Sequence, residues 1–412
     1  MNVLIVTSLF YPEIAANAKR MAHLAEGLRR KGHGVSVITA FPYYSTSKDI
    51  GKYKGKWIVK DQYQGIPVIR TYTYPSRRYG NLFTRLWSFL SFMLSSIFGA
   101  FKIKGKIDVV VTISPPFFSF FSGYVISRIK RASLVLDIQD IYPETLVALG
   151  FLKNKIAIRL LEWLERFFYR KAKGMTAISE AFRQDFMNKG AEVQGVEVVP
   201  NWVDADVFQP MDSGGLRKEY GLDGKFVVMF VGTMGFAQGL ENVIEAARLL
   251  WDHQDGIEFV FLGEGVEKGR LEELVWQYRL PNFIFIPSMP NSEIPRFLSL
   301  ADACLVYLRK NELYKITIPC KTYEYMAMGK PVIMGVEGEA LELIRKGDCG
   351  IGVELESPCD LAKAILGMCK DRDLVRELGK RGREYLVANF NREKIVSRYI
   401  DLLKRCDTRS LR

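Results

Sequence analysis

Short apolar runs alternate with helical stretches along most of this chain, and this alternation constrains its fold more than any other feature. Uninterrupted apolar runs are typical of strands that are buried on both faces of a parallel sheet. The first series of runs comprises Val3–Thr7, Val35–Thr39, Val109–Ile113, Leu134–Ile138, Met175–Ile178 and Val196–Val199. The second comprises Phe226–Val231, Glu258–Leu262, Phe283–Ile286, Cys304–Leu308, Val332–Met334 and Gly352–Leu355. The pattern predicts an α/β protein with two Rossmann-like, doubly wound domains that face a cleft.

A stretch rich in turn-forming residues, 200–215, separates the two series. With 412 residues and a hydrophobic content of 48%, the chain is long and apolar enough for two cores. We therefore predict one domain at residues 1–203 and a second at 204–390. The apolar positions within 391–412 predict a C-terminal helix that packs back on the first domain.

The charge and the cysteines limit the classes of function. A formal net charge of +12 favours anionic partners, namely nucleic acid, nucleotide phosphates or an acidic membrane surface. The six cysteines form no CxxC pair, so the sequence indicates neither a disulfide framework nor a zinc site, and a reducing cytosolic compartment fits better. Two D-x-D patterns, at 204–206 and 371–373, are interpreted as helix caps or surface residues. We expect no metal and no cofactor.

The segment Cys320–Pro331 reads as an acidic helix that leads directly into the apolar run at Val332. Ligands of open α/β sheets bind at the carboxyl ends of the strands, so Glu324 on this helix can face a ligand there. A carboxylate can accept hydrogen bonds from both adjacent hydroxyls of a ribose. Lys321 lies three residues earlier, hence on the same helical face, and is predicted to contact phosphate. The segment therefore predicts a nucleotide-sugar site.

A glycine-rich loop follows the run Phe226–Val231 and opens a helix. Glycines let the backbone approach a diphosphate, and a helix N-terminus presents free N–H groups to it. The spacing matches neither GxGxxG nor GxxxxGK[ST], so a nicotinamide site or a P-loop is not supported. The residues predicted to bind the donor are Gly232, Thr233, Gly235, Gln238, Gly239, Glu264, Ser288, Thr317, Lys321 and Glu324.

Three segments resemble a known family. The stretch Asn201–Pro210 looks like the interdomain signature of retaining glycosyltransferase family 4, which has the GT-B fold. Tyr11–Arg20 resembles the first acceptor-side loop of that family, and Lys321–Pro331 resembles the second half of its E-x7-E motif. The closest branch is the fucosamine-transferase-like group of surface-polysaccharide enzymes. The resemblance implies an acceptor-binding first domain and a nucleotide-sugar-binding second domain.

The chain departs from the family pattern at several positions. Ile316 stands where the first glutamate of E-x7-E would be, and Thr233 and Gln238 stand near the places of an arginine and a lysine. Lys321 is predicted to replace the missing positive charge and to stabilise the leaving group. Asp140 occupies a strand end where many members have a histidine, and it is the candidate group that orients or deprotonates the acceptor. A helix-capping role for Asp140 remains the alternative.

The resemblance also implies an acceptor-side site near the first loop. Its candidate residues are Glu13, Ala15, Ala16, Asn17 and Arg20, and the two alanines stand where the family has paired glycines. Asn17 is predicted to cap the first helix. Arg20 is predicted to lie near the phosphates of the acceptor.

Two aromatic-rich segments, 82–101 and 115–121, predict contact with a membrane surface, because basic residues flank both. The first is long enough to span a bilayer but lies inside a βα series, so an in-plane helix is preferred. Burial of both helices in the core is the alternative. The residues predicted to face lipid are Phe83, Trp87, Phe89, Phe92, Phe98, Phe117 and Phe118.

These inferences favour a retaining glycosyltransferase that moves a hexose or N-acetylhexosamine from a UDP sugar to a polyprenyl-diphosphate-linked sugar. Such an enzyme would assemble O-antigen, capsule or glycoprotein glycan as a peripheral protein at the cytoplasmic face of the cell membrane. One alternative is a GT-B epimerase or hydrolase of nucleotide sugars. Another is a basic nucleic-acid-binding protein, although the aromatic residues cluster in apolar runs instead of alternating with Arg and Lys.

Overall fold

The computed structural model describes residues 1–13, 15–42, 48–75, 82–148, 150, 152–192, 195–251 and 256–407. The chain forms two compact units, one from residues 1–200 and 393–412 and the other from residues 201–392. Each unit is an α/β domain built on its own sheet, so the predicted fold class is confirmed. The boundary between the units lies three residues before the predicted one, at Pro200 and Asn201.

The first unit contains an eight-stranded sheet in the order β3-β4-β2-β1-β5-β6-β7-β8. All neighbours pair in parallel except β3 and β4. Its strands are β1 (Asn2–Thr7), β2 (Gly34–Ala40), β3 (Ile58–Tyr63), β4 (Ile66–Thr71), β5 (Val109–Ser114), β6 (Ser133–Ile138), β7 (Gly174–Ala177) and β8 (Val196–Val198). The antiparallel β3–β4 hairpin at the edge of this sheet is absent from the predicted series.

Helices cover both faces of the first sheet. They are α1 (Ala16–Arg30), η1 (Lys48–Tyr53), α2 (Leu82–Ala100), α3 (Phe118–Lys130), α4 (Glu144–Ala148), α5 (Lys155–Lys171), α6 (Glu180–Asn188) and α16 (Arg392–Cys406). One cluster of buried side chains joins Phe92 of α2 and Ile126 of α3 to Leu4 and Ile38 of the central strands. One face of α2 is therefore buried against the sheet, and its opposite face is exposed to solvent.

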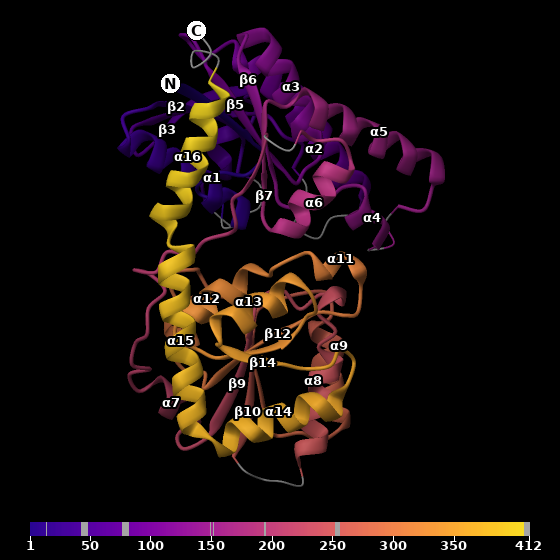
Figure 1. The fold of residues 1–412 in the computed structure, drawn as a ribbon, viewed down its shortest axis with the longest axis vertical. Helices are drawn as coiled ribbons and strands as arrows, with labels where there is room; N and C mark the ends of the chain where they lie inside the picture. Colours follow the sequence, from indigo (N-terminus) through magenta and orange to yellow (C-terminus); the bar gives the residue numbers. More distant parts are fainter. Residues whose placement is uncertain are drawn as a thin grey trace. The chain divides into compact units, whose positions relative to one another are not determined.

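The C-terminal helix α16 packs against α1 of the first unit, as predicted (Figure 1). The contact is close because a glycine faces it: a Cβ on Gly27 would collide with Val396 and approach Ile400. At the other end of α16, Cys406 and Leu402 lie against Gly174 of β7 in the same way. Because Gly27 and Gly174 have no Cβ, the last helix can lie directly on the first domain.

The second unit contains a six-stranded, fully parallel sheet in the order β11-β10-β9-β12-β13-β14. Its strands are β9 (Phe226–Val231), β10 (Ile257–Leu262), β11 (Phe283–Ile286), β12 (Ala303–Tyr307), β13 (Val332–Gly335) and β14 (Gly350–Gly352). Its helices are α7 (Leu216–Glu219), η3 (Phe236–Gln238), α8 (Glu241–Leu250), α9 (Lys268–Gln277), α10 (Ile294–Leu298), α11 (Glu312–Lys315), α12 (Cys320–Ala327), α13 (Glu339–Gly347), α14 (Pro358–Lys370) and α15 (Arg372–Phe390).

The last strand of the second unit corrects the sequence prediction. β14 covers Gly350–Gly352, whereas the apolar pattern predicted Gly352–Leu355. Beyond the ladder, the Glu354 N–H donates to the Asp360 carboxylate at 2.8 Å, and the chain turns toward α14 at Glu356, which has a positive φ of 58°. The apolar residue Val353 still donates its N–H to the carbonyl of Met334 at 2.9 Å, which explains why the pattern extended beyond the strand.

The close packing of α1 on α16 predicts that Gly27→Leu destabilises the protein by about 1–3 kcal/mol, because a well-packed contact cannot admit extra methyl groups. Denaturation by urea would measure this change in the free energy of unfolding. Gly367→Leu is the matched control, since a Cβ on this exposed α14 glycine meets nothing within 4 Å. Equal stabilities of the two variants would contradict the proposed packing constraint.

Candidate functional site

The strand order of the second unit defines where a ligand is expected. The chain runs outward from β9 through β10 to β11, and then returns to the other side of β9 for β12, β13 and β14. The direction of winding reverses between β9 and β12. Ligands of open α/β sheets bind at this switch point, outside the carboxyl ends of the strands.

The loops that follow β9 and β10 interlock at this edge. Gly232 donates its N–H to Leu262 at 2.9 Å, and Met234 donates to the carbonyl of Glu264 at 3.0 Å. Gly232 and Gly263 have φ values of 135° and 150°, in the region that favours glycine. A Cβ on Gly263 would collide with the carbonyl oxygen of Gly232. The two glycines are therefore required for the close approach of these backbones.

The rest of the β9 loop forms a short turn before α8. The side-chain oxygen of Gln238 accepts a hydrogen bond from the Gly235 N–H at 3.0 Å, so this side chain shapes the turn. Gly239 ends the turn with a positive φ of 54°. Thr233 lies exposed at the start of the loop. The sequence predicted these residues as donor contacts, and the geometry assigns Gln238 a structural task in the same loop.

Helix α12 directs Lys321 at the β9 loop. The hydroxyl of Tyr325 receives a hydrogen bond from the Val231 N–H at 2.9 Å and donates to the Val231 carbonyl at 3.3 Å, which fixes the helix against the end of β9. One turn earlier, Lys321 Nζ lies 3.6 Å from the centroid of the Phe230 ring. The same atom lies 3.0 Å from the position that a Cβ on Gly232 would take. A cation therefore adjoins the glycine-rich loop.

Burial of this cation changes its protonation. Desolvation lowers the pKa of Lys321 to about 7, and the negative charges of Glu324 and Cys320 oppose the shift. A bound anion would favour the charged form of Lys321 and so raise its pKa again. The arrangement is suited to hold a phosphate group beside the loop.

Two further basic residues surround the loop and were missed in the sequence. Lys268, in the first turn of α9, forms an ion pair with Glu264 at 2.9 Å. Arg309, which follows β12, donates from Nε to the Phe236 carbonyl at 2.8 Å and stacks over the Phe236 ring at 4.2 Å. The spacing of Lys268, four residues after Glu264, could have indicated the first pair. Arg309 carried a signal as well, since it stands just beyond a predicted strand.

The remaining predicted donor residues lie in the loops around this edge. Thr317 belongs to the turn before α12, and its hydroxyl donates to the Tyr314 carbonyl at 3.0 Å. Glu324 is half-buried on α12. Ser288 is exposed in the loop after β11, two strands away from β9 in the sheet. Ser288 is thus the most remote of the predicted contacts from the switch point.

The first unit has a corresponding switch point between β1 and β5. Asp140 follows β6 near this edge, and burial raises its pKa to about 7. Asn17 does not cap α1: Ala15 occupies the N-cap, and the Asn17 side chain donates to the Pro115 carbonyl at 3.3 Å. Asn17 therefore connects the start of α1 to the loop after β5. Glu13 is buried in the loop after β1, and Ala16 is the first residue of α1.

Arg20, predicted to lie near the acceptor phosphates, makes its described contacts inside the first unit. Its guanidinium is buried and forms an ion pair with Asp137 at 2.9 Å. It also donates to the carbonyls of Val199 at 3.0 Å and Pro200 at 3.2 Å. These bonds tie α1 to β6 and to the end of the first unit, and removal of one partner from such a buried pair would be costly. We interpret Arg20 as a structural residue.

The predicted lipid-facing residues divide between core and surface. Phe92 and Phe117 are buried in the first unit, so the prediction was wrong for these two. Trp87 and Phe98 are 50% and 61% exposed on α2. Phe89 and Phe118 are half-buried, and the side chain of Phe83 lies outside the described residues. Among the described helices, none combines the length and apolar character that a membrane crossing requires.

Of the two D-x-D patterns, the one at 371–373 has the predicted helix-capping role, and the one at 204–206 lies in a turn. Asp371 accepts a hydrogen bond from the Leu374 N–H at 2.9 Å at the start of α15. Asp204 forms an ion pair with Arg392 at 2.6 Å and accepts from the Asp206 N–H at 3.2 Å. Within the described ranges, no three carboxylate, histidine or cysteine side chains gather in a way that could hold a metal ion.

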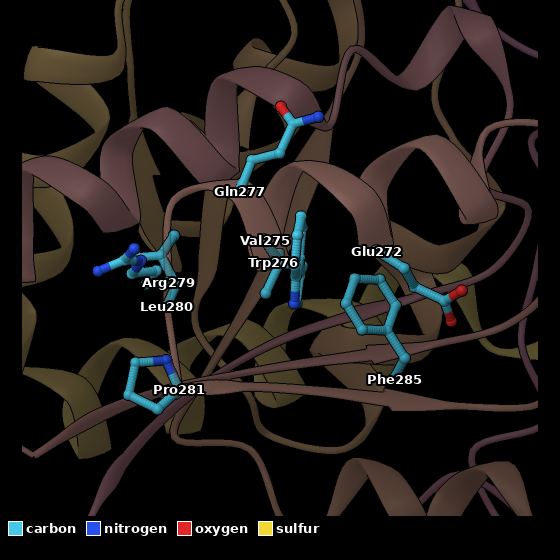
Figure 2. A pocket seen from close by; sticks show the side chains of 8 residues that line it. All are labelled: Glu272, Val275, Trp276, Gln277, Arg279, Leu280, Pro281 and Phe285. Carbon is cyan, nitrogen blue, oxygen red and sulfur yellow. The ribbon is translucent and has the colours of Figure 1, made fainter.

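A pocket of about 760 Å³ lies apart from the switch point, between α9 and the edge strand β11 (Figure 2). Trp276, Phe285 and Arg279 are among the residues that line it. Because β10 separates β11 from β9 in the sheet, this pocket is not continuous with the glycine-rich loop. The convergence of the loop, α12 and the strand ends identifies the candidate site instead.

The depressed pKa of Lys321 predicts a pH-dependent stability. The unfolded chain holds this proton up to the ordinary lysine value of 10.5, whereas the folded chain releases it near 7. The unfolded state thus binds more protons between these values, so the free energy of unfolding should rise with pH across this window. In urea denaturation Lys321→Met should reduce the rise without removing it, because burial also lowers the pKa of Lys330. Lys363→Met, at an exposed position on α14, should retain the full rise. An undiminished rise in Lys321→Met would contradict the depressed pKa of Lys321.

Comparisons with known proteins agree with this geometry. Residues 17–202 match the model of the glycosyl transferase 4-like domain, and residues 214–385 match the model of glycosyl transferases group 1. The chain is 27% identical over 409 residues to WcaI of Escherichia coli K12, named for colanic acid biosynthesis, and covers 99% of it. It is also 27% identical to the glycosyltransferase WbjE of Pseudomonas aeruginosa over 327 residues, which are 76% of this chain and 79% of WbjE.

A solved structure shares the whole fold. The structure of Anabaena Alr3699/HepE in complex with UDP superposes with a TM-score of 0.73 over 98% of this chain and 100% of that chain, at 17% sequence identity. The two family models together match most of the sequence, one in each unit. The chain therefore belongs to the family 4-like glycosyltransferases of the GT-B fold.

Proposed function

We propose that this glycosyltransferase is a retaining enzyme that transfers a hexose or N-acetylhexosamine from a UDP sugar to a polyprenyl-diphosphate-linked sugar during assembly of a surface glycan. The position of Lys321 beside the glycine-rich loop carries the donor part of this proposal. The names of WcaI and of the HepE complex with UDP support the polysaccharide and the uridine nucleotide. We place the reaction at the cytoplasmic face of the membrane.

In this proposal the donor lies along the carboxyl edge of the second sheet. Backbone N–H groups of the loop from Gly232 to Gly239 and the ammonium of Lys321 bind the diphosphate. Glu324 accepts hydrogen bonds from the ribose hydroxyls. Glu264 and Thr317 lie in neighbouring loops and are candidates for contacts with the transferred sugar. The nucleotide sugar is a substrate, and the reaction needs no other cofactor.

Charge develops on the departing diphosphate as the glycosidic bond breaks. Lys321 and the loop N–H groups stabilise this charge, since their positions are fixed before the reaction. The acceptor hydroxyl attacks from the face that the leaving group vacates, which retains the configuration without a covalent intermediate. Asp140 accepts or orients the hydroxyl proton, and a pKa of about 7 suits a general base at neutral pH.

Glu324→Ala tests the donor site. In a thermal-shift screen against UDP, GDP and ADP, we expect wild-type protein to be stabilised by UDP by roughly 2.7 kcal/mol at about 100-fold excess over the Kd. Glu324→Ala should lose this stabilisation because the ribose contact is gone. Glu342→Ala, which removes an exposed carboxylate from α13, should keep it. Stabilisation by none of the nucleotides would contradict the proposal.

Asp140→Asn tests the acceptor step separately. The amide cannot accept the hydroxyl proton, so transfer to a polyprenyl-diphosphate-linked sugar should fall by about 100-fold or more. The UDP-induced thermal shift should remain, because Asp140 belongs to the first unit and the donor loop to the second. Full transfer activity of Asp140→Asn would exclude Asp140 as the base. Sugar release without acceptor would instead indicate a hydrolase.

A further inference from the structure

Helix α5 of the first unit has two apolar faces. Its inner face buries Phe168 and Tyr169, and the Phe168 ring contacts the Phe120 ring of α3 at 6.1 Å. On the opposite face, Ile156, Leu160 and Trp163 are 79%, 56% and 57% exposed. The outer face of a surface helix is ordinarily polar. An apolar outer face therefore indicates a partner.

The outer side chains form a continuous stripe. Ile156, Leu160, Trp163 and Phe167 recur at intervals of three and four residues, which places them on one side of the helix. The rings of Trp163 and Phe167 stack at 6.0 Å with an interplanar angle of 22°. Figure 1 shows α5 extending beyond α3 at the periphery of the unit. Ile156, Leu160 and Trp163 thus face the exterior, whereas Phe167 at the end of the stripe is half-buried and contacts the Tyr124 ring of α3 at 5.5 Å.

Cations border this stripe. The exposed basic residues on α5 and just before it are Lys153, Lys155, Arg159, Arg166, Arg170 and Lys171. Lys171 Nζ lies 5.8 Å from the centroid of the Phe167 ring. The carboxylate of Glu165 points inward, where it receives a hydrogen bond from the Tyr169 hydroxyl at 2.6 Å and pairs with Lys189 at 3.2 Å. The outer surface of α5 is therefore apolar and positively charged.

We propose that the outer face of α5 docks on an anionic lipid bilayer, with the helix parallel to the membrane plane. Apolar side chains then enter the boundary between headgroups and acyl chains, while the basic residues meet lipid phosphates. Trp163 is suited to this depth, since its ring has an apolar body and a polar N–H. This inference rests on the proposed function, because it identifies where the proposed transferase contacts the membrane. Lipid binding can nevertheless be measured without sugar transfer.

The neighbouring helices extend the same surface. Helix α3 packs against both α2 and α5, so the three helices lie side by side in one layer. Phe121 of α3 is 43% exposed, and Trp87 and Phe98 of α2 are 50% and 61% exposed. The sequence placed the membrane contact on α2 and on the start of α3. We assign the principal contact to α5, because exposed basic residues such as Arg159 and Arg166 border its exposed apolar stripe within the helix itself.

A second copy of the chain fits this face less well than a bilayer does. A symmetric dimer would bring the basic residues of one α5 against those of the other, for example Arg159 and Arg166, and like charges repel. An anionic surface complements the same residues. The charge on α5 therefore decides between the two occupants.

Vesicle flotation of the full chain tests this docking. We expect wild-type protein to bind vesicles of phosphatidylcholine mixed with phosphatidylglycerol, and to bind pure phosphatidylcholine vesicles weakly. Added salt should weaken the binding. The double variant Leu160→Gln/Trp163→Gln should bind the mixed vesicles at least about tenfold less, because two apolar side chains no longer leave water. Trp276→Gln, at a tryptophan of the second unit that is 79% exposed, is the matched control and should bind like wild type.

Three results would overturn the proposal. The first is wild-type protein that binds neither vesicle. The second is an α5 double variant that binds as wild type does, and if Trp87→Gln/Phe98→Gln then loses binding, the contact lies on α2. The third is conversion of a wild-type dimer into a monomer by the α5 variant, which would make the face a protein interface. Circular dichroism verifies that each variant is folded. The UDP thermal shift is measured separately from vesicle binding, so failure of the proposed function and failure of the docking proposal can be distinguished.

Discussion

The donor side of this protein depends on the close approach of two backbones at the carboxyl edge of the second sheet. Gly232 and Gly263 end neighbouring strands with φ values that favour glycine, and a Cβ on Gly263 would collide with the Gly232 carbonyl. The space beside Gly232 is also where Lys321 Nζ lies, 3.0 Å from the position of a Cβ there. Because Gly232 and Gly263 have no side chains, the two loops can approach each other and Lys321 has room beside Gly232.

The charged form of Lys321 destabilises the unliganded fold. Burial lowers the pKa of Lys321 to about 7, so keeping it charged at neutral pH has a cost. The helix cannot move the lysine into solvent, because Tyr325 bonds the Val231 backbone one turn later. The ring of Phe230 offsets part of the cost through a cation–π contact. A local arrangement that is unfavourable for the empty protein is typical of sites that gain from ligand binding.

The sequence predicted the parallel strands well, because strands buried on both faces are continuous apolar runs, and β9 and β11 have the predicted bounds. It missed the hairpin of β3 and β4, since β3 is an edge strand whose Lys60 and Asp61 interrupt any apolar run. The glycine-rich loop was found by its position after a strand. The role of Arg20 was not, because its partner Asp137 is 117 residues away and no local pattern indicates the pair.

Side-chain direction explains why the proposed membrane surface was the least predictable feature. Segment 82–101 has large apolar side chains both on the side that packs in the core, such as Phe92, and on the side that faces solvent, such as Trp87. Apolar content therefore could not separate Phe92 from the exposed Trp87. In α5, by contrast, cations alternate with Leu160 and Trp163, and a cation can enter a core only at great cost. A stripe bordered by Arg159 and Arg166 is thus forced outward, so the position of charge, more than the amount of apolar surface, indicates which helix contacts a partner.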